Sequence, residues 1–214
     1  MTQTPSQALR SRWLAALLPH VAFDGWTEAA AAAAASEAGL NEGEQALAAP
    51  HGVIDLIEAF FDAAEAEARG KLAAEDLSGL RVHERVKHGL LAWLAVLEPN
   101  REAVRRAASR GFLPWSAGTA MQRAWSVADM VWTAAGDTAT DYNRYSKRGL
   151  LASVIPPIVM YWVDSPEAAD LDAYVTRRLK QASGVGQTAG KVVTPVLDLL
   201  KTVRNGAKDS PFGR

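Results

Sequence analysis

Histidine and cysteine supply most metal sites and many nucleophiles in proteins, and this chain offers few of either. It contains no cysteine, which excludes disulfides, thiol nucleophiles and cysteine-ligated zinc. Of its four histidines, only His83 and His88 lie close together in the sequence. Their spacing does not place both rings on one helical face, which requires a separation of three or four residues. The sequence therefore predicts no metal site.

Motifs for phosphate binding and for hydrolysis are missing as well. The chain has no glycine-rich loop of the GxxxxGKS or GxGxxG type and no GxSxG nucleophile elbow. Serines such as Ser126, Ser146 and Ser153 occur without a motif that couples one of them to a base. We therefore expect no cofactor and no catalytic residue. An enzyme remains a third hypothesis, which turnover by the isolated chain would support.

The most concentrated group of polar side chains lies between Asp137 and Arg148. Residues 136–141 have the composition of a turn between helices, because Gly136 permits a positive φ and aspartate or threonine caps the next helix. The tyrosines, asparagine and bases of residues 142–148 exceed what a cap requires. Tyrosine and arginine are favoured at protein interfaces. The residues alone leave two interpretations open, a docking surface and a structural cap.

The elements that must position these residues are predicted to be helices. Apolar residues recur at helical spacing along the chain, and no run of alternating β-branched residues indicates a strand. We therefore predict an all-α protein with about nine or ten helices. The expected helices cover residues 8–21, 27–38, 42–49, a longer one from 53, 77–97, 101–110, 121–135, 141–163, 165–181 and 191–204. Gly39 and Gly136 are expected to end two of them, and Pro156 and Pro157 to kink another.

Charge is distributed unevenly along the chain. Between Trp13 and Ala68 there are ten acidic residues and no lysine or arginine. Residues 1–68 thus carry a net charge of −8, from two bases and ten acids, while residues 69–214 carry +7, from 21 bases and 14 acids. Such a charge asymmetry is informative about the binding partners of a protein rather than about its fold.

The first helices resemble the head of TetR-type transcription regulators. The resemblance rests on three short helices, on the turn at Ala38, Gly39 and Leu40, and on the following helix with Phe60 and Phe61. In those regulators the segment after the turn reads DNA. Here residues 41–49 offer two carboxylates and no base, although affinity for DNA normally rests on several lysine or arginine contacts to phosphate. We expect no nucleic-acid binding; sequence-selective binding in a mobility-shift assay would favour the alternative, a TetR-like ligand-responsive regulator.

A second resemblance is more specific. The motif from His20 to Trp26, together with the segment from Ala135 to Arg148, resembles the Coq-nine family of ubiquinone biosynthesis, over most of residues 9–182. This resemblance implies a TetR-like fold that binds isoprenoid and other lipids. It also implies a non-catalytic accessory protein, which presents a polyprenylated quinone precursor to the membrane-associated demethoxyubiquinone hydroxylase.

The resemblance also implies where the binding sites lie. The surface for the hydroxylase would comprise Leu94, Val131, Asp141, Arg144 and Tyr145. The lipid would contact apolar residues of three long helices, namely Leu90, Trp93, Leu97, Met121, Trp125, Met130, Leu151, Ile155, Ile158, Val159 and Trp162. Judged from the residues alone, the favoured role of the tryptophans is to fill an ordinary core, and a ligand cavity is the alternative.

The last predicted helix is amphipathic and corresponds to the terminal membrane-binding helix of the family. Its apolar arc would contact the membrane through Val192, Val193, Val196, Leu197, Leu200 and Val203. Basic residues at its edge suit an anionic bilayer surface. Packing of this helix on its own body or on a second subunit is the alternative interpretation.

These observations predict three regions. Residues 1–68 form an acidic helix-turn-helix-like head with its connecting helix, residues 69–183 a larger helical body that binds lipid and partner, and residues 184–214 a hinge, an amphipathic helix and a tail. No run reaches the roughly 18 apolar residues of a membrane span, and the N-terminus lacks a signal-peptide pattern. We expect a cytoplasmic homodimer, peripheral to the inner face of the membrane.

Overall fold

The computed structural model describes residues 3–109, 119–140, 142–164 and 170–184. All regular structure in these residues is helical, which confirms the predicted all-α class. The helices are α1 (Pro5–Asp24), α2 (Glu28–Glu37), α3 (Glu42–Ala48), α4 (Val53–Ala73), α5 (Val82–Leu97), the 3-10 turn η1 (Glu98–Asn100), α6 (Arg101–Ser109), α7 (Thr119–Ala134) and α8 (Tyr142–Asp164). A further helix covers residues 170–184.

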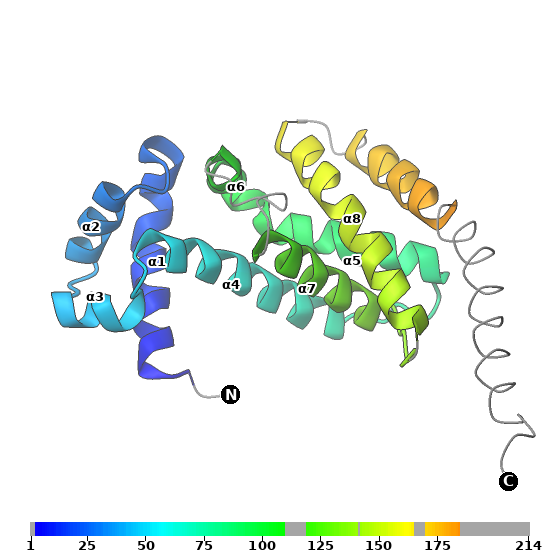
Figure 1. Ribbon diagram of the computed structural model, residues 1–214, viewed down its shortest axis with the longest axis horizontal. Helices are drawn as coiled ribbons and strands as arrows, with labels where there is room; N and C mark the ends of the chain where they lie inside the picture. The colour runs from blue at the N-terminus through cyan, green and yellow to red at the C-terminus, as the bar shows by residue number, and fades with distance from the viewer. Residues whose placement is uncertain (1–2, 110–118, 141, 165–169, 185–214) are drawn as a thin grey trace, which may run out of the picture.

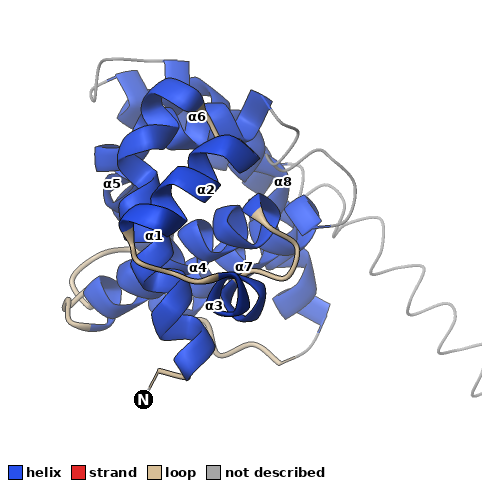
Figure 2. Ribbon diagram, turned by 90° about the vertical axis from the view of Figure 1, so that its left-hand side faces the viewer, coloured by secondary structure: helices blue, strands red, loops and turns tan. Residues whose placement is uncertain are grey.

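Helices α1, α2 and α3 form a group at one end of the molecule, and α4 runs from this group into the body (Figure 1). Viewed from that end, the three helices lie in front of the body (Figure 2). In the body, α7 packs against α5 and α8, and the helix 170–184 lies outside α8. Helix α6 contacts both α1 and α8, so it joins the two parts.

Helices α2 and α3 begin and end within one residue of the prediction, whereas α1 extends three residues further than predicted at each end. Asn41 accepts a hydrogen bond from the backbone of Glu44, whose side chain bonds back to the Asn41 amide, so the two residues form a capping box on α3. Gly39 follows α2 with φ of 64°, and Gly136 follows α7 with φ of 83°. Both glycines adopt the left-handed conformation in which a side chain would be strained, which confirms their predicted role as helix ends.

The largest error in a predicted boundary lies at the start of α5. Helix α5 begins at Val82, not at residue 77, because residues 77–81 form a turn. Asp76 holds this turn by accepting a hydrogen bond from the Ser78 amide, and the Arg85 side chain donates to the carbonyls of Ser78 and Leu80. Helix α8 continues through both prolines. The first residues of the predicted helix 165–181 and the whole of the predicted helix 191–204 lie outside the described residues.

The alanine-rich helix α2 packs tightly because its buried side is made of methyl groups. Ala30, Ala31, Ala34 and Ala35 are buried at helical spacing. Trp13 of α1 crosses this surface and donates from its indole nitrogen to the carbonyl oxygen of Ala31 at 2.8 Å. A larger side chain on this face would separate the two helices.

The segment from His20 to Trp26 joins the N-terminal group to α6. Trp26 is fully buried, and its indole nitrogen donates to the Ala103 carbonyl of α6 at 2.8 Å. Arg106 of α6 donates back to the carbonyl of Ala22. The buried apolar residues form one continuous cluster across this junction. The segment is therefore a tertiary anchor, although Phe23 within it is 84% exposed.

Candidate functional site

The segment from Asp137 to Arg148 forms a buried ion-pair network between α7 and α8. Arg148 is only 3% exposed, and its Nε and Nη1 atoms donate to Asp129 at 2.5 Å and Asp137 at 2.8 Å. Lys147 Nζ donates to the other oxygen of Asp137, also at 2.8 Å. Because Asp129 lies within α7 and Arg148 within α8, the network fixes the angle at which the chain reverses.

The network favours the charged forms of Asp129, Asp137 and Arg148 by shifting their pKa values. Burial alone would raise the pKa of Asp129 and Asp137, but hydrogen bonds and positive charge from Arg148, and for Asp137 also from Lys147, outweigh it and lower the pKa of both carboxyls. Burial alone would lower the pKa of Arg148, yet the bonds from its guanidinium to the two carboxylates raise it. The network is therefore a stable feature at neutral pH.

Two neighbouring side chains point to the surface instead. Tyr145 is 61% exposed, with its ring centroid 6.3 Å from that of Trp125. Arg144 reaches Asp129 with one nitrogen at 3.4 Å while nearly half of its side chain stays exposed. The inner half of the segment thus serves the fold, and Arg144 with Tyr145 forms an exposed pair that capping does not explain.

The other residues predicted for partner binding lie elsewhere. Leu94 and Val131 are buried in the core at 1% and 0% exposure, and Asp141 lies outside the described residues. Val131 lies where α5 and α7 approach closely, since a Cβ added to Gly89 would come within 3.3 Å of it. A partner docked on the described surface would thus contact Arg144 and Tyr145, while Leu94 and Val131 support the helices beneath.

A groove of about 710 Å³ opens between α5, α8 and the helix 170–184, with one residue from α7. Its apolar lining consists of Val86, Trp132, Leu150, Leu151 and Leu179, and its charged or titratable lining of His83, Glu84, Lys87, Lys147 and Lys180. Apolar surface dominates this lining. Such a groove suits a ligand that is mostly apolar and carries one polar end.

The residues predicted for lipid binding mostly fill the core. Nine of them are buried, namely Leu90, Trp93, Leu97, Met130, Leu151, Ile155, Ile158, Val159 and Trp162. Met121 is 56% exposed, and Trp125 is half-buried beside Tyr145. Leu151 is the member of this set that also lines the groove.

Several groove residues escaped the sequence interpretation. Both Val86 and Trp132 line the groove, but Val86 is buried in the core at 5% exposure, whereas Trp132 is half-buried at the edge of the core. Leu179 lies on a separate helix, and no periodicity shows against which neighbour a helix packs. The apolar pattern of the sequence therefore did not show which residues would line the groove.

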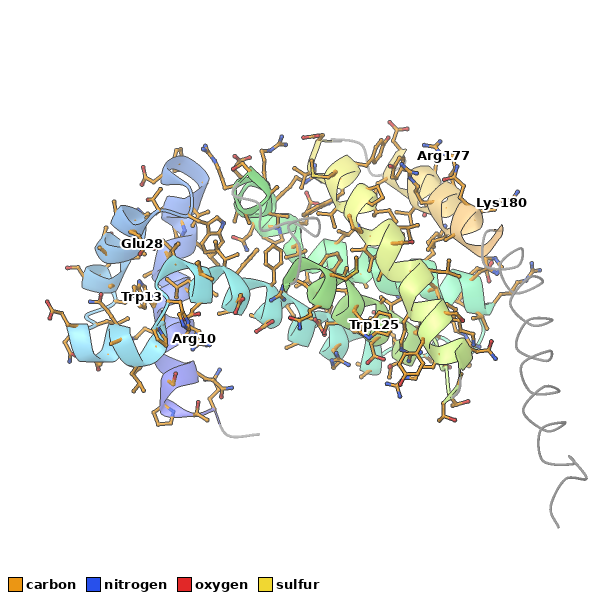
Figure 3. The ribbon with its side chains drawn as sticks, in the orientation of Figure 1. Arg10, Trp13, Glu28, Trp125, Arg177 and Lys180 are labelled. Atoms are coloured by element: carbon orange, nitrogen blue, oxygen red, sulfur yellow. The ribbon has the colours of Figure 1, made fainter. Side chains whose placement is uncertain are left out.

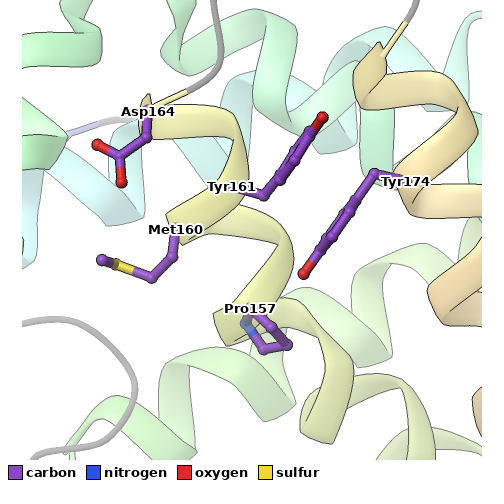
Figure 4. A pocket seen from close by; sticks show the side chains of 5 residues that line it. All are labelled: Pro157, Met160, Tyr161, Asp164 and Tyr174. Carbon is purple, nitrogen blue, oxygen red and sulfur yellow. The ribbon is translucent and has the colours of Figure 1, made fainter.

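The helix 170–184 forms one wall of the groove and is attached to the body by aromatic and polar contacts. Tyr161 and Tyr174 stack with ring centroids 3.9 Å apart and planes 2° from parallel, beside a hollow of about 540 Å³ (Figure 4). Lys87 of α5 pairs with Asp172 at 2.9 Å. These contacts hold the wall in place without filling the groove.

The described residues contain neither a candidate metal site nor a candidate membrane span. Among them no group of three acidic or histidine side chains could hold a metal ion. Within the same ranges, no helix is long and apolar enough to cross a bilayer.

Comparison with known proteins finds a similarity to one family. The sequence model of COQ9 matches residues 117–186, a stretch that contains α7, α8 and the helix 170–184, and with them the ion-pair network and much of the groove. In this stretch the chain is similar to the COQ9 family. This is the family that the motifs of the sequence resemble.

Curated relatives extend the similarity beyond this region. The chain is 27% identical over 195 residues to the human protein named "Ubiquinone biosynthesis protein COQ9, mitochondrial", covering 87% of this chain and 61% of the relative. The protein of the same name from Bos taurus is 29% identical over the same length, and that from Rattus norvegicus 27%. The chain thus spans about three fifths of the length of these COQ9 relatives.

Proposed function

We propose that the chain is a non-catalytic, lipid-binding accessory protein of ubiquinone biosynthesis, which presents a polyprenylated quinone precursor to demethoxyubiquinone hydroxylase at a membrane surface. The observation that carries this proposal is the apolar groove between α5, α8 and the helix 170–184. The names of the COQ9 relatives supply the pathway.

The groove has the chemistry and the size that a lipid chain needs. Its volume of about 710 Å³ falls within the range of small-molecule sites and is open along one side. Each methylene-sized group buried there contributes about 0.8 kcal/mol, so one isoprene unit supplies roughly 4 kcal/mol. A prenyl chain can therefore bind lengthwise while its polar end stays near the rim.

The exposed pair Arg144 and Tyr145 lies close to this groove along the chain. Both residues occupy the first turn of α8, and Lys147, two residues after Tyr145, already lines the groove. Residues two apart point to different sides of a helix, so a hydroxylase bound at Tyr145 would contact the same end of α8 as the ligand but on another face. The support for a docking surface is the exposure of Arg144 and Tyr145, which a capping role does not require.

The same proposal includes a homodimer and peripheral membrane contact through residues 191–204. Those residues lie outside the described part of the chain. Their amphipathic pattern with basic edges is the support for membrane contact. Binding of the full chain to anionic vesicles, compared with a variant carrying Val196→Asp and Leu200→Asp, tests it: unchanged binding would contradict a membrane role for this segment.

Mass spectrometry of the lipids retained by the purified protein tests ligand binding. We expect an isoprenoid in wild type and its loss in Thr176→Trp, because Thr176 is an exposed residue of the groove wall and a tryptophan there would fill the space. Reproducible absence of any isoprenoid, together with normal quinone levels in a deletion strain, would refute the proposal.

A pull-down with the hydroxylase tests the docking surface. Tyr145→Ala should weaken capture, since it removes a 61% exposed aromatic ring from the proposed contact. Phe23→Ala is the matched control, because Phe23 is also an exposed aromatic residue but lies on α1. Equal capture of Tyr145→Ala and wild type would move the docking surface elsewhere.

A further inference from the structure

We propose that the chain docks end-on to an anionic bilayer, with the end of its body that the groove reaches facing the lipid. The docking residues, which we call the mouth surface, are Leu80, Arg81, Val82, Arg177 and Lys180. The inference rests on the proposed function, since a lipid must pass between the groove and a membrane. It adds a membrane contact outside residues 191–204, and with it the orientation of the molecule.

The groove reaches one end of the body because two helix ends line it together. His83 and Glu84 come from the first turn of α5, and Ala182 and Ser183 from the end of the helix 170–184. Figure 1 shows both helix ends on the side of the body that lies away from α1, α2 and α3. The groove therefore lies at the end of the molecule opposite to the N-terminal helices.

Exposed bases gather on one wall of this end. The helix 170–184 has its two acids at positions 170 and 172, and its bases at positions 177, 178 and 180, in the half that lines the groove. Arg177 and Lys180 are exposed and three positions apart, so they are neighbours on the helix surface (Figure 3). Within the described ranges of the chain, neither pairs with an acidic side chain. An anionic surface can therefore contact both without breaking an ion pair.

Exposed apolar side chains lie on the opposite wall. Val82, the first residue of α5, is 54% exposed, and Leu80 in the preceding turn is 38% exposed. Arg81 between them is exposed as well. Apolar side chains next to bases suit a bilayer interface, because the first enter the acyl boundary while the second meet the lipid phosphates. The two walls thus present complementary parts of one membrane-binding surface.

The acids close to the mouth surface are engaged within the protein. Glu84 accepts a hydrogen bond from the amide of residue 81 and caps α5. Asp76 accepts from the amide of residue 78, Glu75 pairs with a histidine of α5, and Asp172 pairs with Lys87. Each of these carboxylates has a donor of its own. The exposed bases therefore dominate the electrostatic field at this end.

The acidic N-terminal part favours the same orientation. Residues 1–68 carry a net charge of −8 and residues 69–214 a net charge of +7. An anionic bilayer attracts bases and repels acids over a Debye length, about 8 Å at physiological salt. End-on docking keeps α1, α2 and α3 beyond this distance, whereas a molecule lying flat would bring them to the surface. The charge asymmetry that disfavours nucleic acid thus orients the chain on a membrane.

Single labelled cysteines test the orientation, since the chain has no cysteine of its own. Val82→Cys and Leu47→Cys place an environment-sensitive dye at two positions of equal exposure, 54%, one on α5 and one on α3. With vesicles of phosphatidylcholine and phosphatidylglycerol, the dye at position 82 should shift its emission to the blue and be quenched by nitroxide-labelled lipid. The dye at position 47 should do neither.

Charge variants of the full chain test the attraction. Lys180→Glu should weaken binding to the same vesicles roughly tenfold in a sedimentation assay, and added sodium chloride should reduce this difference. Arg12→Glu is the matched control, because it makes the same change of charge at an exposed base on α1. Its affinity should equal that of wild type.

The outcomes separate this inference from the proposed function. Equal dye responses at positions 82 and 47 would overturn the end-on orientation, and equal affinities of the two charge variants would overturn the mouth surface. Neither result touches ligand binding, which the retained-lipid measurement decides by itself. If wild type does not bind the vesicles, this inference fails together with the proposed membrane contact, and the lipid groove is still judged by its own ligand.

Discussion

The N-terminal helices and the C-terminal body use their charged residues in different ways. In the N-terminal part, acids bond to backbone amides at the starts of helices: Glu28 accepts from the Val53 amide, and Asp55 from the His51 amide. In the body, Arg148 joins the buried carboxylate of Asp137 and the half-buried carboxylate of Asp129. The first kind of contact satisfies backbone amides at helix starts, and the second pairs charged side chains of two helices across a turn.

This difference changes the meaning of the acidic excess. Several of the ten acids between Trp13 and Ala68 stabilise helix starts, where a negative charge is favourable. Glu65 bonds to Ser126 of α7, and Asp62 pairs with Arg123, so two others hold α4 against the body. The net charge of a region therefore indicates which charged partners it repels. Each of the acids named here nevertheless has a structural role.

The largest contrast is expected at Arg148. Arg148→Met should lower the free energy of unfolding by about 3 to 5 kcal/mol, because it leaves the buried carboxylate of Asp137 and the half-buried carboxylate of Asp129 without this partner. Urea denaturation followed by circular dichroism measures the loss. Lys71→Met, which breaks the exposed pair with Glu67, is the control and should cost less than about 0.5 kcal/mol. Similar losses in the two variants would erase the contrast between buried and exposed pairs.

The buried carboxylates should also make stability depend on pH. The pKa of Asp137 is lowered from its ordinary value of 3.8, so its ionisation stabilises the fold above that value and this contribution is lost as pH falls through the lower folded value. Asp137→Asn should therefore be less stable than wild type at pH 7, and the gap should shrink below about pH 4. Urea midpoints between neutral and acidic pH measure it; a constant gap would contradict the pairing.

The junction between the two parts should give an intermediate effect. Trp26→Phe keeps the buried ring but removes the bond to the Ala103 carbonyl, at an expected loss of about 1 to 3 kcal/mol. Thermal or urea unfolding measures the loss, and Phe23→Leu, at an 84% exposed position nearby, serves as the control. If both variants unfold like wild type, the indole bond does not hold the parts together.

The smallest effect is expected at a helix cap in the N-terminal group. Asn41→Ala should cost about 1 kcal/mol, because it removes the side-chain acceptor for the Glu44 amide. Amide hydrogen exchange should quicken at the start of α3 and stay unchanged in α8. Faster exchange in α8 as well would show that this cap acts beyond its own helix.

The sequence predicted the helices well where local signals define them. Asn41 and Gly39 bound two helices by capping chemistry that depends only on their neighbours in the chain. The start of α5 was misplaced because Leu77 and Leu80 continue the apolar pattern, while the contact of Arg85 with the carbonyl of Leu80 belongs to the folded turn. Periodicity measures amphipathicity, and it does not measure such contacts.

The site was predicted less completely than the helices. The polar segment from Asp137 to Arg148 was visible as a cluster, but its partner Asp129 lies two turns earlier and carries no motif. The lipid residues were placed at the centres of apolar stripes, which the fold buries. The groove is lined instead by residues such as Trp132 and Leu150 at the edge of the core, and they border a cavity only where the helix 170–184 approaches α5 and α8.

The sequence by itself determined the helical class, most helix ends and the charge asymmetry, because propensity, caps and periodicity act between residues near in the chain. It also carried the motifs by which the COQ9 family is recognised. The tertiary structure alone decided that Arg148 is buried between two aspartates and that Lys180 borders an apolar groove. The burial of a side chain and its ion pairs depend on which helices pack together. The residues that neighbour it in the sequence do not determine that packing.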